Sequence, residues 1–198
     1  MTTTDKPALR ERLLAARRLV TDDVRTREAR ALGEHLGSVA PSGSTVCAYV
    51  PTATEPGSIE MLELLLRRAG RVLVPVARTA DDGTAMPLRW GEYRPGRLVP
   101  GRFGLLEPPE PWLPAPALAQ AAMVLVPALA VDRRGVRLGH GRGFYDRSLV
   151  YRDPRALVVA VVRDEEFVEE LPFEPHDVRV NQVLTPARGM VPVDTHRE

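Results

Sequence analysis

A segment rich in glycine and arginine is the part of this chain whose residue types are best suited to chemistry. It reads VPALAVDRRGVRLGHGRGFYDR over residues 126–147 and joins an apolar run to an expected helix near Tyr145. Gly139, Gly141 and Gly143 stand at alternate positions. Glycines spaced in this way let the backbone adopt positive φ, so that successive N–H groups point at an anion. With the positive end of the following helix, the segment predicts a phosphate cradle.

Two arginines and an aspartate extend the predicted cradle. Arg137 and Arg142 can donate charge-assisted hydrogen bonds to phosphate, and Asp146 is placed to hold a magnesium ion. Neither common phosphate motif is present. A Walker A loop needs lysine and then serine or threonine after its last glycine, and Phe144 stands where the dinucleotide fingerprint needs glycine or alanine. A tight turn with solvated arginines is the alternative interpretation.

Length, charge and cysteine content narrow the class of protein. The 198 residues suit one domain with a substantial core, and 27 basic against 26 acidic residues leave a net charge of +1. This balance does not indicate a broad nucleic-acid-binding surface. The single cysteine, Cys47, suits a reducing compartment, and no apolar run approaches the ~20 residues that span a bilayer. We therefore expect a monomeric cytoplasmic protein without nucleic-acid or membrane partners.

Alternating helix and strand patterns predict how these residues are positioned. Apolar residues at three- and four-residue spacings predict one or two helices between Asp5 and about Gly37, and another helix from Ile59 to about Gly70. Short apolar runs predict strands at 45–50, 71–76, 121–126 and 156–162, with strand and turn between 85 and 97. The alternation favours an α/β fold of three layers, in which a mostly parallel open sheet carries helices on both faces.

The order of these elements predicts where a ligand binds. In an open α/β sheet, ligands gather beyond the carboxyl ends of the strands. Glu55 follows the strand that ends at Val50, and the glycine segment follows the strand that ends at Val126. We expect one site at this edge, in a single domain spanning residues 1–198 with a loose tail over residues 191–198.

The glycine segment resembles the ATP loop of the 5-formyltetrahydrofolate cyclo-ligase family, also called 5,10-methenyltetrahydrofolate synthetase. Further similarity follows in the same order over nearly the whole chain, in KPALR (6–10), YVP (49–51) followed by Glu55, LEP (106–108) and EPHDVRVN (174–181). The resemblance implies ATP and Mg²⁺, with a reduced folate carrying a formyl group on N5 as substrate. It also implies that ATP phosphorylates the formyl oxygen and that N10 then attacks the activated carbon as phosphate leaves.

The resemblance further implies roles for particular residues. For the nucleotide it implies Lys6 and Arg10 together with Arg137, Leu138, Gly139, His140, Gly141, Arg142, Gly143, Phe144 and Tyr145. For the folate it implies Val50, Glu55, Trp90 and Tyr145. Arg142 and Asp146 are expected to be catalytic, and Asp146 and Asn181 are expected to bind the metal. Because Asn181 stands where the family usually has a second aspartate, magnesium should be held less tightly.

Several of these residues also have plainer interpretations. Lys6 and Arg10 suit a solvated helix face, a loop glutamate such as Glu55 is usually only solvated, and Trp90 could belong to the core.

Two further points stay open at the level of sequence. His176 and Asp177 adjoin, but without a serine or cysteine nucleophile beside them a structural role is favoured over a general base. The chain could also be a nucleotide- or folate-binding homologue with weak or no turnover, for which Asn181 is the best argument. A third possibility is an ATP-dependent ligase acting on another formamide or carboxyl substrate.

Overall fold

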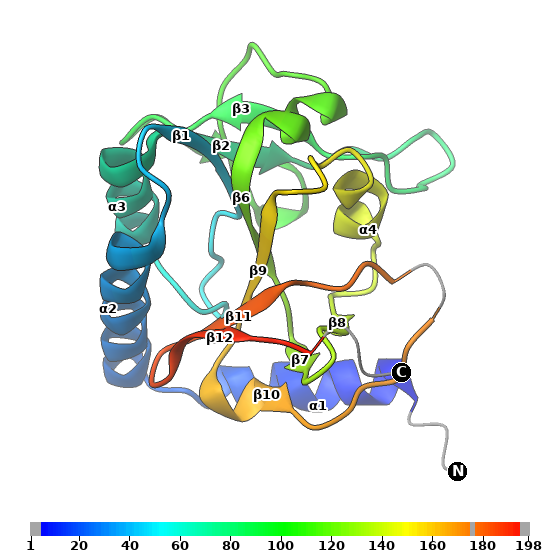
Figure 1. Ribbon diagram of the computed structural model, residues 1–198. Coiled ribbons are helices and arrows are strands. Elements are labelled where there is room, and N and C mark those ends of the chain that lie inside the picture. The colour runs from blue at the N-terminus through cyan, green and yellow to red at the C-terminus, as the bar shows by residue number, and fades with distance from the viewer. Residues whose placement is uncertain (1–4, 175–176, 195–198) are drawn as a thin grey trace.

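A sheet of seven strands runs through the middle of the protein in the computed structural model, which describes residues 5–174 and 177–194 (Figure 1). The five inner strands are parallel, and the two edge strands are antiparallel to their neighbours. In spatial order the strands are β12 (Gly189–Pro192), β11 (Gln182–Thr185), β9 (Leu157–Val161), β6 (Ala121–Pro127), β1 (Ser44–Ala48), β2 (Gly70–Val76) and β3 (Arg89–Glu92).

Helices cover both faces of this sheet. Helices α2 (Asp22–Val39) and α3 (Ile59–Ala69) lie side by side on one face, and α4 (Phe144–Leu149) and the 3-10 helix η2 (Ala115–Gln120) lie on the other (Figure 1). Each face of the sheet has its own hydrophobic core, and successive residues of β6 point into opposite cores. Val124 packs on the α4 face and Leu125 on the α2–α3 face. Strands buried on both faces are continuous apolar runs, which is why the sequence pattern located them. The predicted three-layer α/β fold is confirmed.

A separate helix, α1 (Lys6–Arg18), lies along the lower side of the molecule in Figure 1. Its Leu9, Leu13 and Leu14 pack on a small three-stranded sheet made of β10 (Phe167–Val168), β7 (Ala130–Asp132) and β8 (Arg137–Leu138). The other short elements are β4 (Val99–Pro100), the 3-10 helix η1 (Arg102–Gly104), β5 (Leu106–Glu107) and the 3-10 helix η3 (Asp164–Glu166). The small sheet continues the chain after β6, so α1 is held next to the glycine segment.

The carboxyl-terminal segment differs from the prediction of a loose tail over residues 191–198. Val191 and Pro192 pair with β11 as part of β12, and the N–H groups of Val193 and Asp194 donate to the carbonyls of Asn181 (3.3 Å) and Arg133 (2.8 Å). Residues 195–198 lie outside the described residues. The pattern missed this hairpin because its strands have only four residues each.

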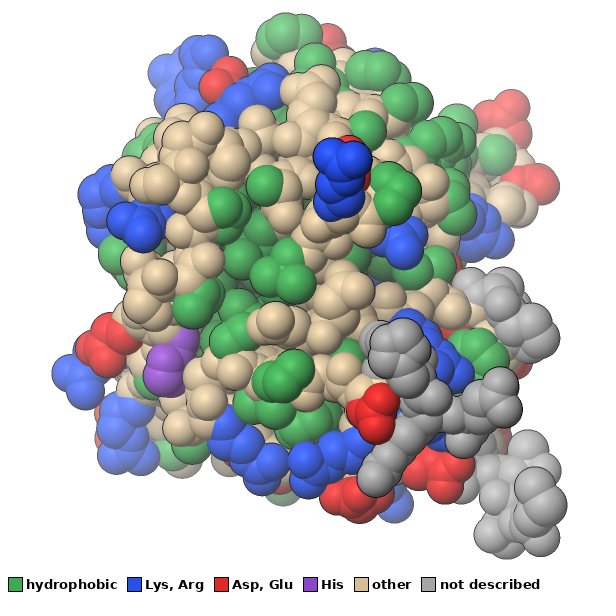
Figure 2. Space-filling model, in the orientation of Figure 1, with side chains coloured by type: hydrophobic (Ala, Val, Ile, Leu, Met, Phe, Trp, Pro, Cys, Tyr) green, Lys and Arg blue, Asp and Glu red, His purple; other side chains and the backbone are tan. Residues whose placement is uncertain are grey.

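Charge is mixed on the described part of the face shown in Figure 2. Lys and Arg side chains lie around its margin among Asp and Glu, and hydrophobic side chains gather toward the middle (Figure 2). This distribution agrees with the net charge of +1. Across residues 5–174 and 177–194, no helix is long and apolar enough to cross a membrane.

Candidate functional site

A cavity of about 460 Å³ opens past the carboxyl ends of β1, β2 and β6, bounded by α1 and the glycine segment. This is the edge at which the sequence predicted a site. The cavity brings together fourteen of the sixteen predicted site residues: Lys6, Arg10, Val50, Glu55, Arg137, Leu138, Gly139, His140, Gly141, Arg142, Gly143, Phe144, Tyr145 and Asp146.

Two of the three glycines in the glycine segment have the backbone conformation expected of a cradle. Gly141 and Gly143 have φ values of 90° and 73°, whereas Gly139 is not among the positive-φ residues. A Cβ on Gly141 would lie 3.3 Å from Cζ of Arg10, and Arg10 Nε donates to the carbonyl of Gly139 at 2.9 Å. The φ value therefore favours glycine at position 141, and a side chain there would also crowd the guanidinium of Arg10.

Asp146 is held against the cavity wall by Arg137. Arg137 Nη2 donates to Asp146 Oδ1 at 2.6 Å, and the side chains are 4% and 30% exposed. The Nε of Arg137 is buried and has no hydrogen-bond partner in the described structure. The pair fixes the direction of the Asp146 carboxylate and leaves one buried donor of Arg137 unused, beside the place where an anion would lie.

Lys6 faces two carboxylates at the same cavity. Its Nζ lies 2.7 Å from Glu174 Oε2 and 3.0 Å from Asp177 Oδ2, and all three residues line the cavity. Burial alone would lower the pKa of Lys6, but the hydrogen bonds with Glu174 and Asp177 raise it above its usual range. The lysine therefore remains charged at neutral pH.

Asp177 is a cavity residue that the sequence analysis did not select. A structural role was favoured for His176 and Asp177; Asp177 lies in the wall of the cavity and pairs with Lys6, and His176 is outside the described residues. The sequence did contain an indication that Asp177 could be a site residue, because it belongs to the same 174–181 motif from which Asn181 was selected.

Glu55 is held by hydrogen bonds from both sides of the cavity. The backbone N–H and the hydroxyl of Thr52 each donate to Glu55 Oε2 at 2.9 Å, and His140 Nε2 lies 3.2 Å from Oε1. Burial would raise the pKa of Glu55, but the contacts with His140 and Thr52 outweigh it and lower the pKa below the ordinary 4.5. Glu55 is thus a carboxylate at neutral pH, with the glycine segment beside it.

Aromatic side chains supply the apolar part of the cavity. The hydroxyl of Tyr145 is buried without a partner in the described structure, and burial raises the pKa of Tyr145 well above its usual range. It therefore remains a phenol that can donate to a ligand.

Phe103 is a cavity residue that the sequence analysis missed. It has a positive φ of 61°, its ring centroid lies 5.8 Å from that of Phe144, and the guanidinium of Arg142 lies 4.2 Å from its ring centre. A positive φ at a bulky residue is strained and is typical of functional loops. Sequence alone gave no sign of this conformation.

Two predicted site residues lie elsewhere. Trp90 in β3 is 1% exposed and packs in the core on the α4 face, as its plainer interpretation held. Asn181 directly precedes β11, and its Oδ1 accepts the N–H of Val158 at 2.8 Å. Asn181 therefore lies at the amino ends of β9 and β11, whereas the cavity lies past the carboxyl ends of the parallel strands. It is not brought together with Asp146.

The carboxylates of the cavity limit how a cation could be held. Within the described ranges, no three His, Cys, Asp or Glu side chains cluster as a metal site. Mg²⁺ usually binds through one or two carboxylates, waters and the phosphates of its substrate. Asp146 and Asp177 are two carboxylates of this kind in the cavity wall.

The fold and this cavity together define an α/β protein with a ligand site at the carboxyl edge of its sheet, lined by cations and a glycine-rich loop. The sequence model of the 5-formyltetrahydrofolate cyclo-ligase family matches residues 2–186, and the chain belongs to that family. It is 55% identical over 191 residues to the 5-formyltetrahydrofolate cyclo-ligase of Mycolicibacterium smegmatis, covering 96% of this chain and 98% of the relative. It is 31% identical over 146 residues to that of Escherichia coli K12, covering 73% and 79%.

Solved structures share the fold. The 5,10-methenyltetrahydrofolate synthetase of Aquifex aeolicus matches with a TM-score of 0.76 at 24% identity, over 98% of this chain and 95% of the other. The enzyme of the same name from Mycoplasma pneumoniae matches with a TM-score of 0.68 at 20% identity, over 91% and 98%. The family resemblance stated from the sequence motifs is confirmed.

The lowered pKa of Glu55 predicts an effect on acid stability. A carboxylate whose pKa is lower in the folded state stabilises the native state at pH values above its ordinary pKa of 4.5. This contribution is lost as the pH falls through the lower, folded-state pKa. Between about pH 5 and 3, the free energy of unfolding should fall less steeply in Glu55→Gln than in the wild type. Urea titrations across this range measure it.

Glu34→Gln is the matched control, because the Glu34 side chain is 71% exposed and pairs with the solvent-facing Arg30 at 3.7 Å. It should follow the wild-type slope. Equal slopes for Glu55→Gln and the wild type would contradict the effect assigned to Glu55.

Proposed function

We propose that this protein catalyses the ATP- and Mg²⁺-dependent cyclisation of 5-formyltetrahydrofolate to 5,10-methenyltetrahydrofolate, with release of ADP and phosphate. One observation carries the proposal: in a chain of the cyclo-ligase family, one cavity gathers Lys6 and Arg10, the glycine segment and Glu55. We also propose that it acts as a single-domain monomer in the cytoplasm.

The chemistry requires positioning and charge neutralisation more than a covalent catalyst. A formamide oxygen is a poor leaving group, and transfer of the γ-phosphoryl group of ATP onto it creates a good one. The N10 lone pair then attacks the formyl carbon, the C–O bond breaks with its electrons leaving on phosphate, and N10 loses its proton. Holding both substrates in one cavity makes the steps intramolecular, and cations stabilise the charge on the moving phosphoryl oxygens.

The nucleotide end of the proposed site is cationic. Arg142 and the backbone N–H groups of residues 139–143 bind the phosphates, with Lys6 and Arg10 approaching from α1. Lys6 exchanges its carboxylate partners for phosphate oxygens as the nucleotide enters. Mg²⁺ held by Asp146 and Asp177 would supply further charge neutralisation on the phosphate oxygens.

The folate end of the proposed site combines one carboxylate with apolar walls. Glu55, ionised and fixed by Thr52, accepts hydrogen bonds from folate N–H groups. The hydroxyl of Tyr145 donates to the ligand, and Val50 gives apolar contact beside it. In this proposal the formyl oxygen lies near the phosphates.

The structure bears on the two alternatives raised from the sequence. The argument for a homologue without turnover was Asn181 as a weakened metal ligand, and Asn181 instead bonds Val158 away from the cavity. An ATP-dependent ligase for another formamide or carboxyl compound keeps the same site. A panel of such substrates scored by ADP release distinguishes this case.

A direct assay tests the proposed reaction. Purified protein given 5-formyltetrahydrofolate, ATP and Mg²⁺ should generate the near-ultraviolet absorbance of the methenyl product and ADP in equal amounts. ADP release without that absorbance would support a different acceptor. Neither signal at high enzyme concentration would overturn the proposal.

Arg142→Ala should weaken nucleotide binding with little effect on folding. Losing one charge-assisted contact to phosphate should cost about 1.5 to 3 kcal/mol of binding free energy. Arg155→Ala is the matched control, since Arg155 is exposed and does not line the cavity. Calorimetry with a non-hydrolysable ATP analogue compares the two. Equal affinities in both variants would argue against the role of Arg142.

Asp177→Asn should raise the Mg²⁺ concentration needed for half-maximal activity, because an amide oxygen carries no negative charge. Asn181→Ala should leave that concentration unchanged while lowering the melting temperature, because it removes the acceptor of the Val158 N–H. Mg²⁺ titrations and thermal denaturation of both variants measure these effects. An altered Mg²⁺ requirement in Asn181→Ala alone would restore Asn181 as the metal ligand.

A further inference from the structure

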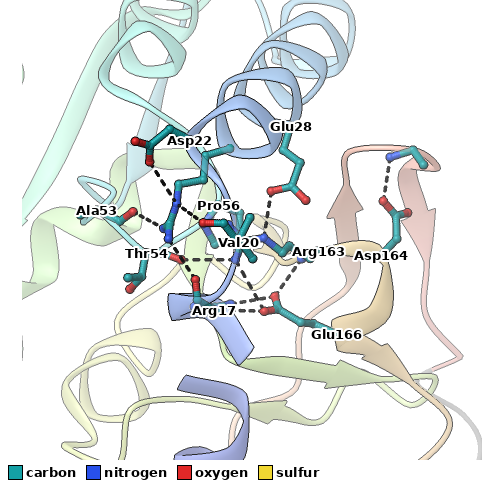
Figure 3. A network of polar contacts seen from close by, with 12 residues as sticks. Arg17, Val20, Asp22, Glu28, Ala53, Thr54, Pro56, Arg163, Asp164 and Glu166 are labelled. Atoms are coloured by element: carbon teal, nitrogen blue, oxygen red, sulfur yellow. Dashed lines mark hydrogen bonds and ion pairs between the residues drawn. The ribbon is translucent and has the colours of Figure 1, made fainter. Parts of the chain in front are cut away.

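A buried cluster of four charged side chains lies outside the walls of the cavity (Figure 3). Arg17 of α1 donates through Nε to Glu166 Oε1 at 2.7 Å and through Nη2 to Glu166 Oε2 at 2.8 Å. Arg163 donates its backbone N–H to Glu166 Oε2 and its Nε to Glu28 Oε2, both at 2.8 Å. Arg17, Arg163 and Glu166 are at most 3% exposed.

Stability alone does not account for this cluster. Burying charges costs solvation, and apolar side chains of similar volume often stabilise a core equally well or better. Nη1 of Arg17 is buried and has no hydrogen-bond partner in the described structure, so part of that cost is not offset. A bidentate arginine–carboxylate pair does, however, fix geometry closely. The function of the cluster therefore depends on which segments of the chain it holds in place.

The first of these segments is the helix that carries the cations. Lys6, Arg10 and Arg17 lie at spacings of four and seven residues, which place them on one face of α1. Arg17 is two helical turns from Arg10, about 10 Å along a rigid element. Its Nη2 also donates at 2.6 Å to the carbonyl of Ala128, near the start of the glycine segment. The cluster thus sets the height and rotation of α1 against that segment.

The second segment is the loop that carries Glu55. Nη1 of Arg163 donates to the carbonyl of Thr54 at 3.3 Å. On the other side, Arg25 of α2 donates to the carbonyl of Ala53 and, through Nη2, to the carbonyl of Arg17 at 3.1 Å (Figure 3). The two residues before Glu55 are therefore tied to the same network that holds α1.

We infer that the Arg17–Glu166–Arg163 cluster is a positioning device that sets the nucleotide wall and the folate wall of the cavity relative to each other. This inference rests on the proposed function, in which Lys6 and Arg10 meet ATP and Glu55 meets the folate. None of the three residues lines the cavity. Arg17 bonds the carbonyl of Ala128 and Arg163 bonds that of Thr54. Each of these carbonyls belongs to a residue directly next to one that does line the cavity, Pro127 and Glu55. Loss of the cluster should therefore impair binding of both substrates at once.

The double variant Arg17→Met/Glu166→Met tests this inference. It removes the Arg17–Glu166 ion pair, and the two methionines occupy a similar volume. The Arg163–Glu28 pair is kept, so that no buried charge loses its only partner. The KM values for ATP and for 5-formyltetrahydrofolate should both rise roughly tenfold or more, with a smaller change in kcat, since misplacing binding groups by about 1 Å can cost up to about 10²-fold.

Leu118→Ala is the control. It truncates a fully buried side chain of η2 in the core on the α4 face, and Leu118 lies outside the walls of the cavity. The two proteins should have similar melting temperatures, and the control should keep wild-type KM values. A role in folding alone would lower the melting temperature of the double variant with both KM values within twofold of the wild type, and that result would overturn the inference.

Arg17→Lys keeps the test informative if the double variant does not fold. Lysine retains the charge but cannot bridge both oxygens of Glu166 and the Ala128 carbonyl, so both KM values should still rise, by a smaller factor. Unchanged KM values in folded Arg17→Lys would also overturn the inference. Absence of turnover in the wild type refutes the proposed function itself, so the two failures are distinguishable.

Discussion

Burial of the parallel sheet on both faces is the constraint on which the rest of this structure depends. With α2 and α3 on one side and α4 and η2 on the other, the backbone groups of the inner strands pair within the sheet, and the buried side chains of these strands are predominantly apolar. Polar chemistry is then confined to the ends of the strands. The loops after β1, β2 and β6 meet at one end, and the cavity forms there.

Carboxylates already pair with cations of the cavity, so an anion that binds there competes with these carboxylates for the same cations. Lys6 is paired with Glu174 and Asp177, and Arg137 is paired with Asp146. These pairs keep the cations fixed and offset their desolvation when no phosphate is bound. In the proposed reaction, an entering phosphate would take over the cations, and the carboxylates would then become available to a divalent cation that enters with it. The same side chains can thus serve the empty and the occupied cavity without a large rearrangement.

The part of this structure that could be predicted from sequence was set by burial. The inner strands were found because double-sided burial makes them apolar runs. Glu55 and the glycine segment were found because they follow such runs, whereas Lys6 and Arg10 were assigned from the family resemblance. Phe103 was missed because its position depends on a strained loop conformation with no local signature. Trp90 was misplaced because residue type alone does not separate a core aromatic from one in a binding site.

Asp177 and Asn181 show why residues within one motif can have unrelated roles. Strand β11 runs parallel to β9, so the chain must reach the amino end of the sheet before β11 begins. Four residues in extended conformation cover about 13 Å, close to the length of a five-residue strand. Val178 and Val180 pack against the core along this crossing. Asp177 therefore remains at the cavity and Asn181 is carried to the far end of the strands. Geometry thus assigns the carboxylate at the start of the crossing to the ligand site and the amide at its end to the sheet.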